Sequence, residues 1–443
     1  MSTTDERLRV EYVTDPVAAM SRLAAERRFG EYVIYEGGGE WVFAADPAAT
    51  IELDADQLRI AAAGSVTSTN WHGSPARALD RALAGLPANG RNAYGWIGFE
   101  FCARSLRATG YLPPRTVLAQ LMLPRLEVRI DLSGRVWVTG AGADETAALL
   151  DLVAGSQDDP LPRAYPVEVA LDATGYRERV EKAVAEIAAG RYQKVILSRR
   201  VELPFAVDIP ATYRLGRAHN TPARSFALCL GGLEAAGFSP ELVLAVDEDR
   251  TVSTEPLAGT RAFGLGADID SAARAELTTD PKEIVEHAIS VQTCFAEVAA
   301  VAEPGTTAVS DFMAVRERGS VQHLASTVRG RLAPGRTAWD ALEVLFPSVT
   351  ASGIPKPAGV DAVFRLDSPR GLYSGAVLRV SPAGAMEAAL VLRAVYQNDH
   401  GAWLRAGAGV VAQSRPEREF EETCEKLRSV APYIVKAGGA LRS

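Results

Sequence analysis

Cysteine is scarce in this sequence, which contains only Cys102, Cys229, Cys294 and Cys424 among 443 residues. They lie far apart, and no Cys-x-x-Cys motif occurs. A disulfide-rich scaffold and a cysteine-ligated zinc site are therefore excluded. Because each cysteine lies in an apolar or predicted helical stretch, we expect reduced, partly buried thiols, as in cytoplasmic proteins.

Long apolar runs and clusters of positive charge are also lacking. No apolar run reaches the roughly 18 residues that a membrane-spanning helix needs. The N-terminal MSTTDERLRV lacks the apolar segment of a secretory signal. No Lys/Arg-rich run or basic–aromatic stripe occurs. We therefore expect a cytoplasmic protein that binds neither membranes nor nucleic acid.

The remaining composition is typical of a soluble globular protein. Apolar residues make up 47% of the chain, charged residues 23%, and the formal net charge is -8. An acidic protein of this kind can bind an anionic substrate only through local cations or a bound metal.

The order of predicted elements indicates a single α+β unit over 1–443. Its N-terminal part, 1–165, is rich in strand signals, and the part 172–436 combines strand meanders with long helices. The polar, proline-rich stretch 156–166 reads as a linker or crossing loop. We expect large antiparallel β-sheets with helices packed on the outside.

Periodicity and turn residues place the individual elements. A hairpin is expected around Gly37–Gly39 and a turn at Ser133–Gly134. Helices are expected at 146–155, 173–192, 280–302 and 337–348 and from near Ser414 onward. Strands are expected at 32–46, 92–104, 125–141, 194–205, 320–332, 371–381, 386–397 and 402–411, and a strand-rich meander at 225–264.

Two Glu-x-x-Glu pairs, Glu283/Glu286 and Glu419/Glu422, lie near the starts of predicted helices. Residues three apart share a helix face, so two such faces brought together would form a nest of four carboxylates. Hard oxygen ligands without cysteine favour Mg²⁺ over zinc.

The alternative is purely structural. Asp280 with Glu283, and Ser414 with Glu417, each fit a helix capping box. Glu422 and Lys426, four residues apart, could form an ordinary surface ion pair.

Lys194 and Glu241 each stand at the edge of an apolar strand. Burial would lower the pKa of Lys194 and make it a usable base. Burial would raise the pKa of Glu241 and suit it to act as a general acid. The alternatives are a snorkelling lysine and a solvated strand-end glutamate.

Other candidates carry weaker signals. Arg393 lies inside a predicted apolar strand, so it requires an anionic partner, either a bound carboxylate or a glutamate. The stretches 257–264 and 404–411 read as small-residue turns that could offer backbone N–H groups to a ligand. His287 and His323 have no companion histidine at metal spacing, which argues against zinc.

Together these stretches resemble the chorismate-utilising enzymes: anthranilate synthase large subunit, aminodeoxychorismate synthase, isochorismate synthase and salicylate synthase. The matching segments, in family order, are KVILSR, GFSPE, TEPLAGTR, KEIVEH, VQHLAS, FPSVTASGIPK, GLYSGAV, LRAGAGVV and EREFEETCEK. EYVIYEGGGEWVFAAD and GWIGFEF additionally resemble salicylate synthases of mycobactin-type siderophore pathways.

The resemblance implies a role for each matching residue. Lys194 would activate water for attack at C2 of chorismate, and Glu241 would protonate the departing C4 hydroxyl. Glu286 and Glu422 would bind Mg²⁺ directly, with Glu283 and Glu419 close by or acting through water, and the metal would bridge to the ring carboxylate. Arg393 and Tyr373 would hold the enolpyruvyl carboxylate. The further implied substrate contacts are Gly259, Thr260, His323, Thr350, Gly407, Ala408, Gly409 and Lys426.

Two positions discriminate within the resembled family. Anthranilate synthases usually carry Gln where Lys194 stands, and many aminodeoxychorismate synthases carry a nucleophilic lysine where Ala258 stands. Lys194 with Ala258 therefore implies that water is the nucleophile, and no glutaminase subunit is expected.

The resemblance thus implies a monomeric, Mg²⁺-dependent salicylate synthase that converts chorismate through isochorismate. The alternatives are an isochorismate synthase that releases its product and a non-catalytic chorismate-binding protein.

Overall fold

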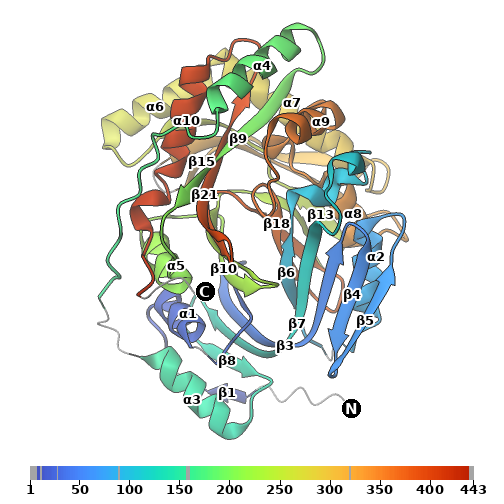
Figure 1. Cartoon of the computed structure of the whole chain (residues 1–443), viewed down its shortest axis with the longest axis vertical. Helices are drawn as coiled ribbons and strands as arrows, with labels where there is room; N and C mark the ends of the chain where they lie inside the picture. The colour runs from blue at the N-terminus through green and yellow to red at the C-terminus, as the bar shows by residue number, and fades with distance from the viewer. Residues whose placement is uncertain are drawn as a thin grey trace.

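The computed structural model describes residues 7–9, 12–26, 28–87, 90–155, 160–318 and 321–438. Most of the N-terminal decapeptide and residues 156–159 of the expected linker lie outside the described residues, and the linker's remainder, 160–166, forms no helix or strand. Two long strands, β3 (Glu40–Asp54) and β7 (Val117–Asp131), pair along almost their whole lengths. They connect the two halves of the β-structure, which Figure 1 shows at the centre of the molecule.

All strand pairs in the described part of the chain are antiparallel. One half runs outward from β3 through β2 (Tyr32–Gly37), β10 (Arg224–Leu230), β11 (Leu233–Ser239), β20 (Ala394–Asn398), β21 (Gly401–Val410), β9 (Lys194–Leu203) and β17 (Gly353–Ile354).

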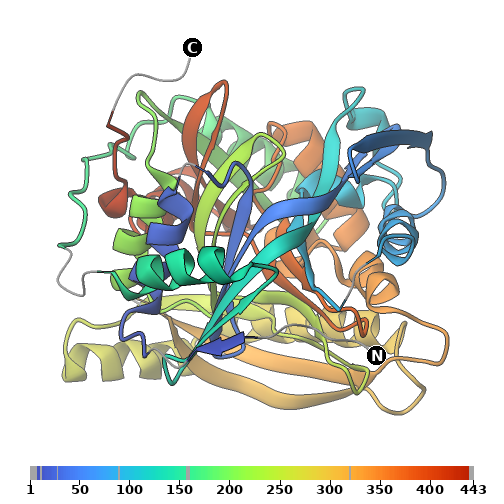
Figure 2. The same ribbon diagram turned by 90° about the horizontal axis from the view of Figure 1, so that it is seen from below.

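The other half runs from β7 through β6 (Ala93–Ile97), β18 (Ala376–Val380), β19 (Met386–Leu390), β12 (Leu242–Val246), β13 (Thr251–Thr254) and β16 (Val321–Arg331). Both β14 (Leu257–Ala262) and β15 (Ala308–Arg318) pair with β16. Figure 2 shows β15 and β16 as long curved strands along one side of the molecule. The remaining strands are β1 (Arg7–Arg9) and β8 (Val136–Thr139) next to β7, and β4 (Gln57–Ala62) and β5 (Ser65–Asn70) next to β3.

Helices cover the outer faces of this β-structure (Figure 1). The helices α1 (Pro16–Ala25), α3 (Ala143–Ala154) and α5 (Ile209–Ala218) form one group, and α2 (Pro75–Ala84) packs on α8 (Ala338–Leu345) on another side. The remaining helices are α4 (Tyr176–Ala188), α6 (Ala267–Thr279), α7 (Pro281–Ala299), α9 (Lys356–Leu366) and α10 (Pro416–Leu427). The predicted α+β class with antiparallel sheets and external helices is confirmed.

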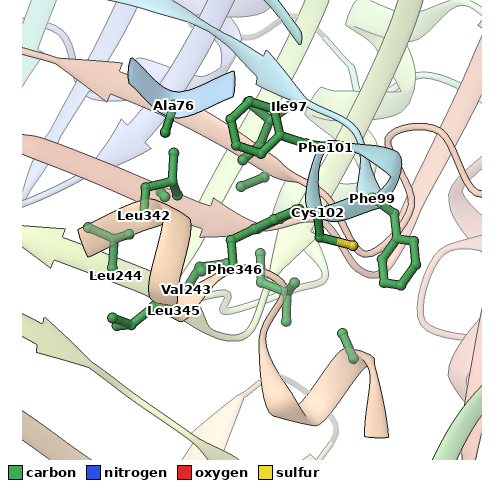
Figure 3. Close-up of a cluster of buried hydrophobic side chains, with 14 of the residues drawn as sticks. Ala76, Ile97, Phe99, Phe101, Cys102, Val243, Leu244, Leu342, Leu345 and Phe346 are labelled. Atoms are coloured by element: carbon green, nitrogen blue, oxygen red, sulfur yellow. The ribbon is translucent and has the colours of Figure 1, made fainter. Parts of the chain in front are cut away.

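Three apolar cores follow from this layering. One fills the space between the two halves of the β-structure and includes Tyr35, Trp96 and Phe226. A second packs α1, α3 and α5 against strands. The third core, shown in Figure 3, brings together side chains from α2, η1 (Phe99–Ala103) and α8, and its members include Phe101, Leu342 and Phe346. Burying such side chains typically stabilises the fold by about 1.5–3 kcal/mol each.

Several predicted elements form as expected. The hairpin turn uses Gly38 and Gly39, whose φ angles of 62° and 83° favour glycine. The amphipathic helix 173–192 forms as α4, with Val180 and Ala183 buried. The four cysteines are free, and all but Cys229 are buried. Among the described helices none is long and apolar enough to cross a membrane.

Other elements differ from the sequence-based expectation. The strand predicted at 92–104 ends at Ile97, where Gly98 begins the short 3₁₀ turn η1. The helices α1, α2, α5, α6 and α9 and the strands β4, β5 and β15 were not predicted. The segment of α6 buries only Leu277, so it lacks a continuous apolar stripe.

Candidate active site

Lys194 is the first residue of β9, where the chain leaves α4. Its side chain is 8% exposed, so the snorkelling alternative is wrong. The Nζ atom donates a short hydrogen bond to a carboxylate oxygen of Glu286 on α7. Gly409 of the neighbouring strand makes room for it, since a Cβ there would lie 3.0 Å from Cε of Lys194. Gly409 of β21 and the carboxylate of Glu286 thus fix the position of the lysine side chain.

Glu241 follows Pro240 between β11 and β12 and is 3% exposed, so the solvated alternative is also wrong. One carboxylate oxygen accepts hydrogen bonds from Thr350 Oγ1 at 2.7 Å and Ser348 Oγ at 3.0 Å. Burial raises the pKa of Glu241 to about 8, although the two hydroxyls and the charge of Lys194 act against the rise. The sequence-based expectation of a raised pKa is confirmed, and this carboxyl is protonated at neutral pH.

The expected capping boxes are not formed. Asp280 does cap α7, but its own N–H donates to Glu276 O, and the Glu283 carboxylate accepts from Arg261 at 3.2 Å instead. The helix α10 begins at Pro416 with Arg415 as N-cap and no side-chain cap. The Ser414 hydroxyl accepts from Val411 N at 3.0 Å. Arg261 of β14 therefore binds both Glu283 and the N-cap residue Asp280, the latter at 3.0 Å.

Two lysines near Glu286 act electrostatically on Glu419 and Glu422 of the other pair. Lys194 bonds Glu286, and its charge also contributes to the lowered pKa of Glu422, which burial opposes. Lys282, on the helix of Glu286, acts on Glu419. Burial nevertheless raises the pKa of Glu419, which is 5% exposed. The faces of α7 and α10 thus share cations.

These carboxylates do not converge on one point in the structure. Within the described residues, no group of three or more His, Cys, Asp or Glu side chains is spaced to hold a metal ion. Glu286 is paired with Lys194, Glu422 with Lys426 at 2.8 Å, and Glu283 with Arg261. The donor set nevertheless fits Mg²⁺, because it consists of hard carboxylates, each of which already has a cationic neighbour.

Arg393 and His323 form a second part of the site. Arg393 was predicted to lie inside a strand, but it lies in the break between β19 and β20, with a φ of 51°. It donates to His323 Nε2 at 3.0 Å. Burial lowers the pKa of His323 to about 3, so its neutral ring accepts there and donates from Nδ1 to Gly259 O at 3.1 Å. Thr260 Oγ1 lies 3.1 Å from the same Nδ1.

Arg393 has no carboxylate partner among the described residues, so the alternative of a protein glutamate is wrong. Burial lowers its pKa to about 10, with the charge of Arg318 acting in the same direction. A cation that is buried without an anion is costly, and a bound carboxylate would remove this cost. A non-glycine residue at positive φ is also a conformation that recurs at functional sites.

The stretches expected to be small-residue turns are strands. Residues 257–262 form β14 and 404–410 belong to β21. Gly259 keeps a φ of 62°, and a Cβ on it would lie 2.9 Å from Glu283 Oε2. Gly407 and Ala408 pair with Ser198 and Leu197 of β9.

The residues around Gly407 gather the last predicted contacts. A Cβ on Gly407 would lie 2.9 Å from the Tyr373 hydroxyl, so glycine gives this ring access. Lys426 Nζ donates to Gly407 O at 2.9 Å as well as to Glu422. The helix α10 is thereby bonded to β21 next to Lys194.

Three side chains in this region were missed by sequence reasoning. Ser348 shares Glu241 with Thr350, and Arg261 binds Glu283. One face of the β15–β16 pair carries Arg318, Arg316 and His323, because Arg316 is two residues from Arg318 and lies opposite His323. The Nε atom of Arg318 is buried without a hydrogen-bond partner. Ser348 stands in FPSVTA beside Thr350, which is the only signal that could have found it. His287, in contrast, bonds Ser326 Oγ at 2.7 Å and lies buried beneath the site.

The site and the fold agree with one known family. Residues 30–432 match the chorismate binding enzyme family, and the chain belongs to it. The salicylate synthase of Mycolicibacterium paratuberculosis is 53% identical over 95% of this chain and 93% of its own length. Anthranilate synthase component 1 of Streptomyces coelicolor is 40% identical over 60% of this chain and 52% of its own length.

Solved structures confirm the fold. Anthranilate synthase component I of Streptococcus pneumoniae superposes with a TM-score of 0.74 at 22% identity, covering 90% of this chain and 92% of that chain. The menaquinone-specific isochorismate synthase of Escherichia coli gives 0.72 at 21% identity, covering 97% and 95%. The resemblance to chorismate-utilising enzymes inferred from sequence motifs is confirmed by the family match and by the 53% identical relative.

Proposed function

We propose that this protein is a salicylate synthase that converts chorismate into isochorismate and then into salicylate and pyruvate. The observation that carries the proposal is the 53% identity to a salicylate synthase over nearly the whole of both chains. The site supports it independently, because the charge of the buried Lys194 acts on Glu241, a buried carboxyl whose pKa is raised to about 8.

The first step is acid–base chemistry on the ring. Lys194 is assigned the role of general base, taking a proton from water as the oxygen attacks C2 of chorismate. Glu241, protonated at neutral pH, donates its proton to the C4 hydroxyl, which leaves as water. Thr350 and Ser348 then stabilise the Glu241 carboxylate with their hydroxyls. Water enters and water leaves, so isochorismate is an isomer of chorismate.

Mg²⁺ would be held by Glu286 and Glu422, with Glu283 and Glu419 close by or acting through water. When bound, the metal would neutralise and anchor the ring carboxylate of the substrate. Each of these carboxylates keeps a cationic neighbour on the protein, namely Lys194, Lys426, Arg261 or Lys282. We infer that these lysines and arginines reduce the repulsion among the acidic groups.

The enolpyruvyl carboxylate is assigned to Arg393 and Tyr373. Arg393 offers donors that no described carboxylate uses, and the neutral ring of His323 holds its guanidinium in place. Thr260, Gly259, Gly407, Ala408, Gly409 and Lys426 complete the walls, chiefly with backbone and small side chains. Gly407 and Gly409 leave the space that the Tyr373 hydroxyl and the Lys194 side chain occupy, so a larger residue at either position would displace these groups.

The second step needs orientation more than a second base. A hydrogen moves from C2 of isochorismate to the methylene of the enolpyruvyl group as the C3–O bond breaks, which yields pyruvate and the aromatic ring of salicylate. Holding both carboxylates fixed favours this internal transfer. Because water replaces ammonia as the nucleophile, we infer that the protein acts without a glutaminase subunit. We also infer that it is a cytoplasmic monomer and that it supplies salicylate for siderophore biosynthesis.

The test is product analysis. The purified protein is incubated with chorismate and Mg²⁺ at neutral pH, and salicylate, pyruvate and isochorismate are quantified over time. We expect salicylate and pyruvate in equal amounts. Isochorismate as the sole product would support the alternative isochorismate synthase, and unchanged chorismate would support a non-catalytic binding protein.

A further inference from the structure

Arg370 lies directly beneath the site, in the loop between α9 and β18, and no role was expected for it. Its side chain is 1% exposed, so the guanidinium is surrounded by protein. A buried arginine must find partners for its donors. All of the partners found for it lie on elements that carry site residues or support them.

Two of its hydrogen bonds reach the backbone beside the acid–base pair. One Nη atom donates to Ile196 O at 2.6 Å, two residues after Lys194 on β9. The other donates to Ala351 O at 2.8 Å, next to Thr350, whose hydroxyl binds Glu241. A single planar group therefore spans the strand of the base and the turn that binds the acid.

The orientation of the guanidinium is itself held. Asp367, also 1% exposed, accepts from Arg370 Nε at 3.0 Å and Nη2 at 2.9 Å. Although burial opposes its ionisation, Arg370, Arg405 and Arg179 together hold the pKa of Asp367 below its ordinary value. Asp367 also accepts from the backbone N–H of Ser198 at 3.1 Å, so it binds β9 a second time.

The backbone of Arg370 is fixed as well. Its N–H donates to buried Glu100 at 2.7 Å, and the following N–H, of Gly371, donates to the same carboxylate at 3.0 Å. The guanidinium also lies 5.7 Å from the ring centre of Tyr373, an expected substrate contact. The loop therefore cannot shift without moving several site elements together.

We propose that Arg370 is a positioning residue that sets the distance between Lys194 and Glu241 across the substrate ring. The inference rests on the proposed function, because it assigns these two residues to one acid–base step. Arg370 touches neither the substrate nor the reacting atoms. It acts through the backbone of β9 and of η3 (Val349–Ala351).

Replacement by lysine tests the inference most sharply. Lysine keeps the charge but offers a point donor in place of the planar fork, so it cannot bind Ile196 O, Ala351 O and Asp367 together. A displacement of reacting groups by about 1 Å can cost about 100-fold in rate. We expect Arg370→Lys to lower kcat by about 10-fold to 100-fold while KM changes less than about threefold.

The pH profile supplies a readout that a general loss of stability would not move. The hydroxyl of Thr350 favours ionised Glu241. If its turn loosens, the basic limb of the kcat profile should move upward by about half a unit to one unit, the effect of one weakened hydrogen bond. Arg379→Lys is the matched control, because Arg379 is an ion-paired arginine on β18 that binds Glu40 outside the site.

The outcomes separate the two proposals. Folded Arg370→Lys with wild-type kcat and an unmoved limb would overturn the positioning role, as would a raised KM with unchanged kcat. If this variant does not fold, Arg370→Met is measured instead, since Asp367 keeps Arg179 at 2.6 Å as a partner. Failure of both to fold while Arg379→Lys folds would show a structural role and also overturn the inference. Wild-type protein that forms no salicylate would overturn the proposed function itself.

Discussion

Two carboxylates outside the site, Glu387 and Glu36, are closed into complete pairs with arginines, whereas Glu241 and Arg393 in the site have no oppositely charged partner in contact among the described residues. Glu387 accepts two hydrogen bonds of 2.7 Å from Arg224 and one of 2.5 Å from Tyr35. Glu36 is bound in the same forked way by Arg217. In the site, Glu241 has only hydroxyl donors, and Arg393 has no carboxylate partner among the described residues.

The two regions thus show two uses of buried charge. A forked arginine–carboxylate pair satisfies both partners and leaves nothing for a ligand. An unpaired buried group is shifted in its protonation and is held there only because the surrounding fold supports it. The direction of the pKa shifts follows this division, since the pKa of Glu387 is lowered despite burial while that of Glu241 is raised.

The largest expected effect concerns the carboxylates of α7 and α10 that are assigned to the metal. Glu286→Gln or Glu422→Gln should abolish salicylate formation, because each removes a hard ligand from the proposed Mg²⁺ site. Excess chelator should do the same to the wild type. Glu425→Gln is the matched control on α10, where Glu425 pairs with Arg418 at the surface. Full activity in chelator would contradict the metal proposal.

Lys194→Ala should divide the two steps. With chorismate we expect no salicylate, since no other described base is placed to activate the water. With isochorismate supplied directly, salicylate should still form, if slowly, because the elimination depends on orientation. Salicylate is followed with each substrate in turn. Equal and complete loss with both substrates in a folded variant would give Lys194 a role in the elimination too.

The raised pKa of Glu241 predicts a smaller, graded effect of pH. The acid must be protonated, so activity with chorismate should fall about tenfold per unit as pH rises above about 8. Folding stability follows the same sign. The unfolded carboxyl ionises near 4.3, so wild-type stability should decline between roughly pH 4.3 and 8 relative to Glu241→Gln. Parallel denaturant titrations of both proteins across this range measure the difference, and parallel curves would refute the shift.

The smallest effect on activity should come from substitutions in the closed pairs, which lower the free energy of unfolding instead. Arg224→Met leaves Glu387 buried without its cation and should lower the unfolding free energy by about 3 kcal/mol. Arg393→Met removes an unpaired cation and should leave stability within about 1 kcal/mol of wild type while substrate binding is lost. Denaturant midpoints and KM values measure the two quantities. A larger destabilisation by Arg393→Met would remove the distinction between open and closed charges.

Local sequence signals predicted site residues correctly where the residue's own strand or helix determines its burial. Lys194 precedes Val195, Ile196 and Leu197, and this apolar run correctly placed it on a buried strand. The run after Glu241 did the same for the acid. The capping box at Asp280 is not formed because Arg261 of β14 binds both Asp280 and Glu283. The one at Ser414 is not formed because α10 begins at Pro416 with Arg415 as its N-cap.

The sequence by itself determined the most periodic elements, such as α4, α7 and β9, and the membership of the family, because apolar periodicity and ordered motifs are local properties. Only the tertiary structure decided that Arg393 lies in a break between strands and keeps no carboxylate. The same holds for Arg370, which joins Ile196 and Ala351, 155 residues apart in the chain, by two hydrogen bonds. Such bonds depend on where separate elements meet, and no pattern within one element specifies that meeting.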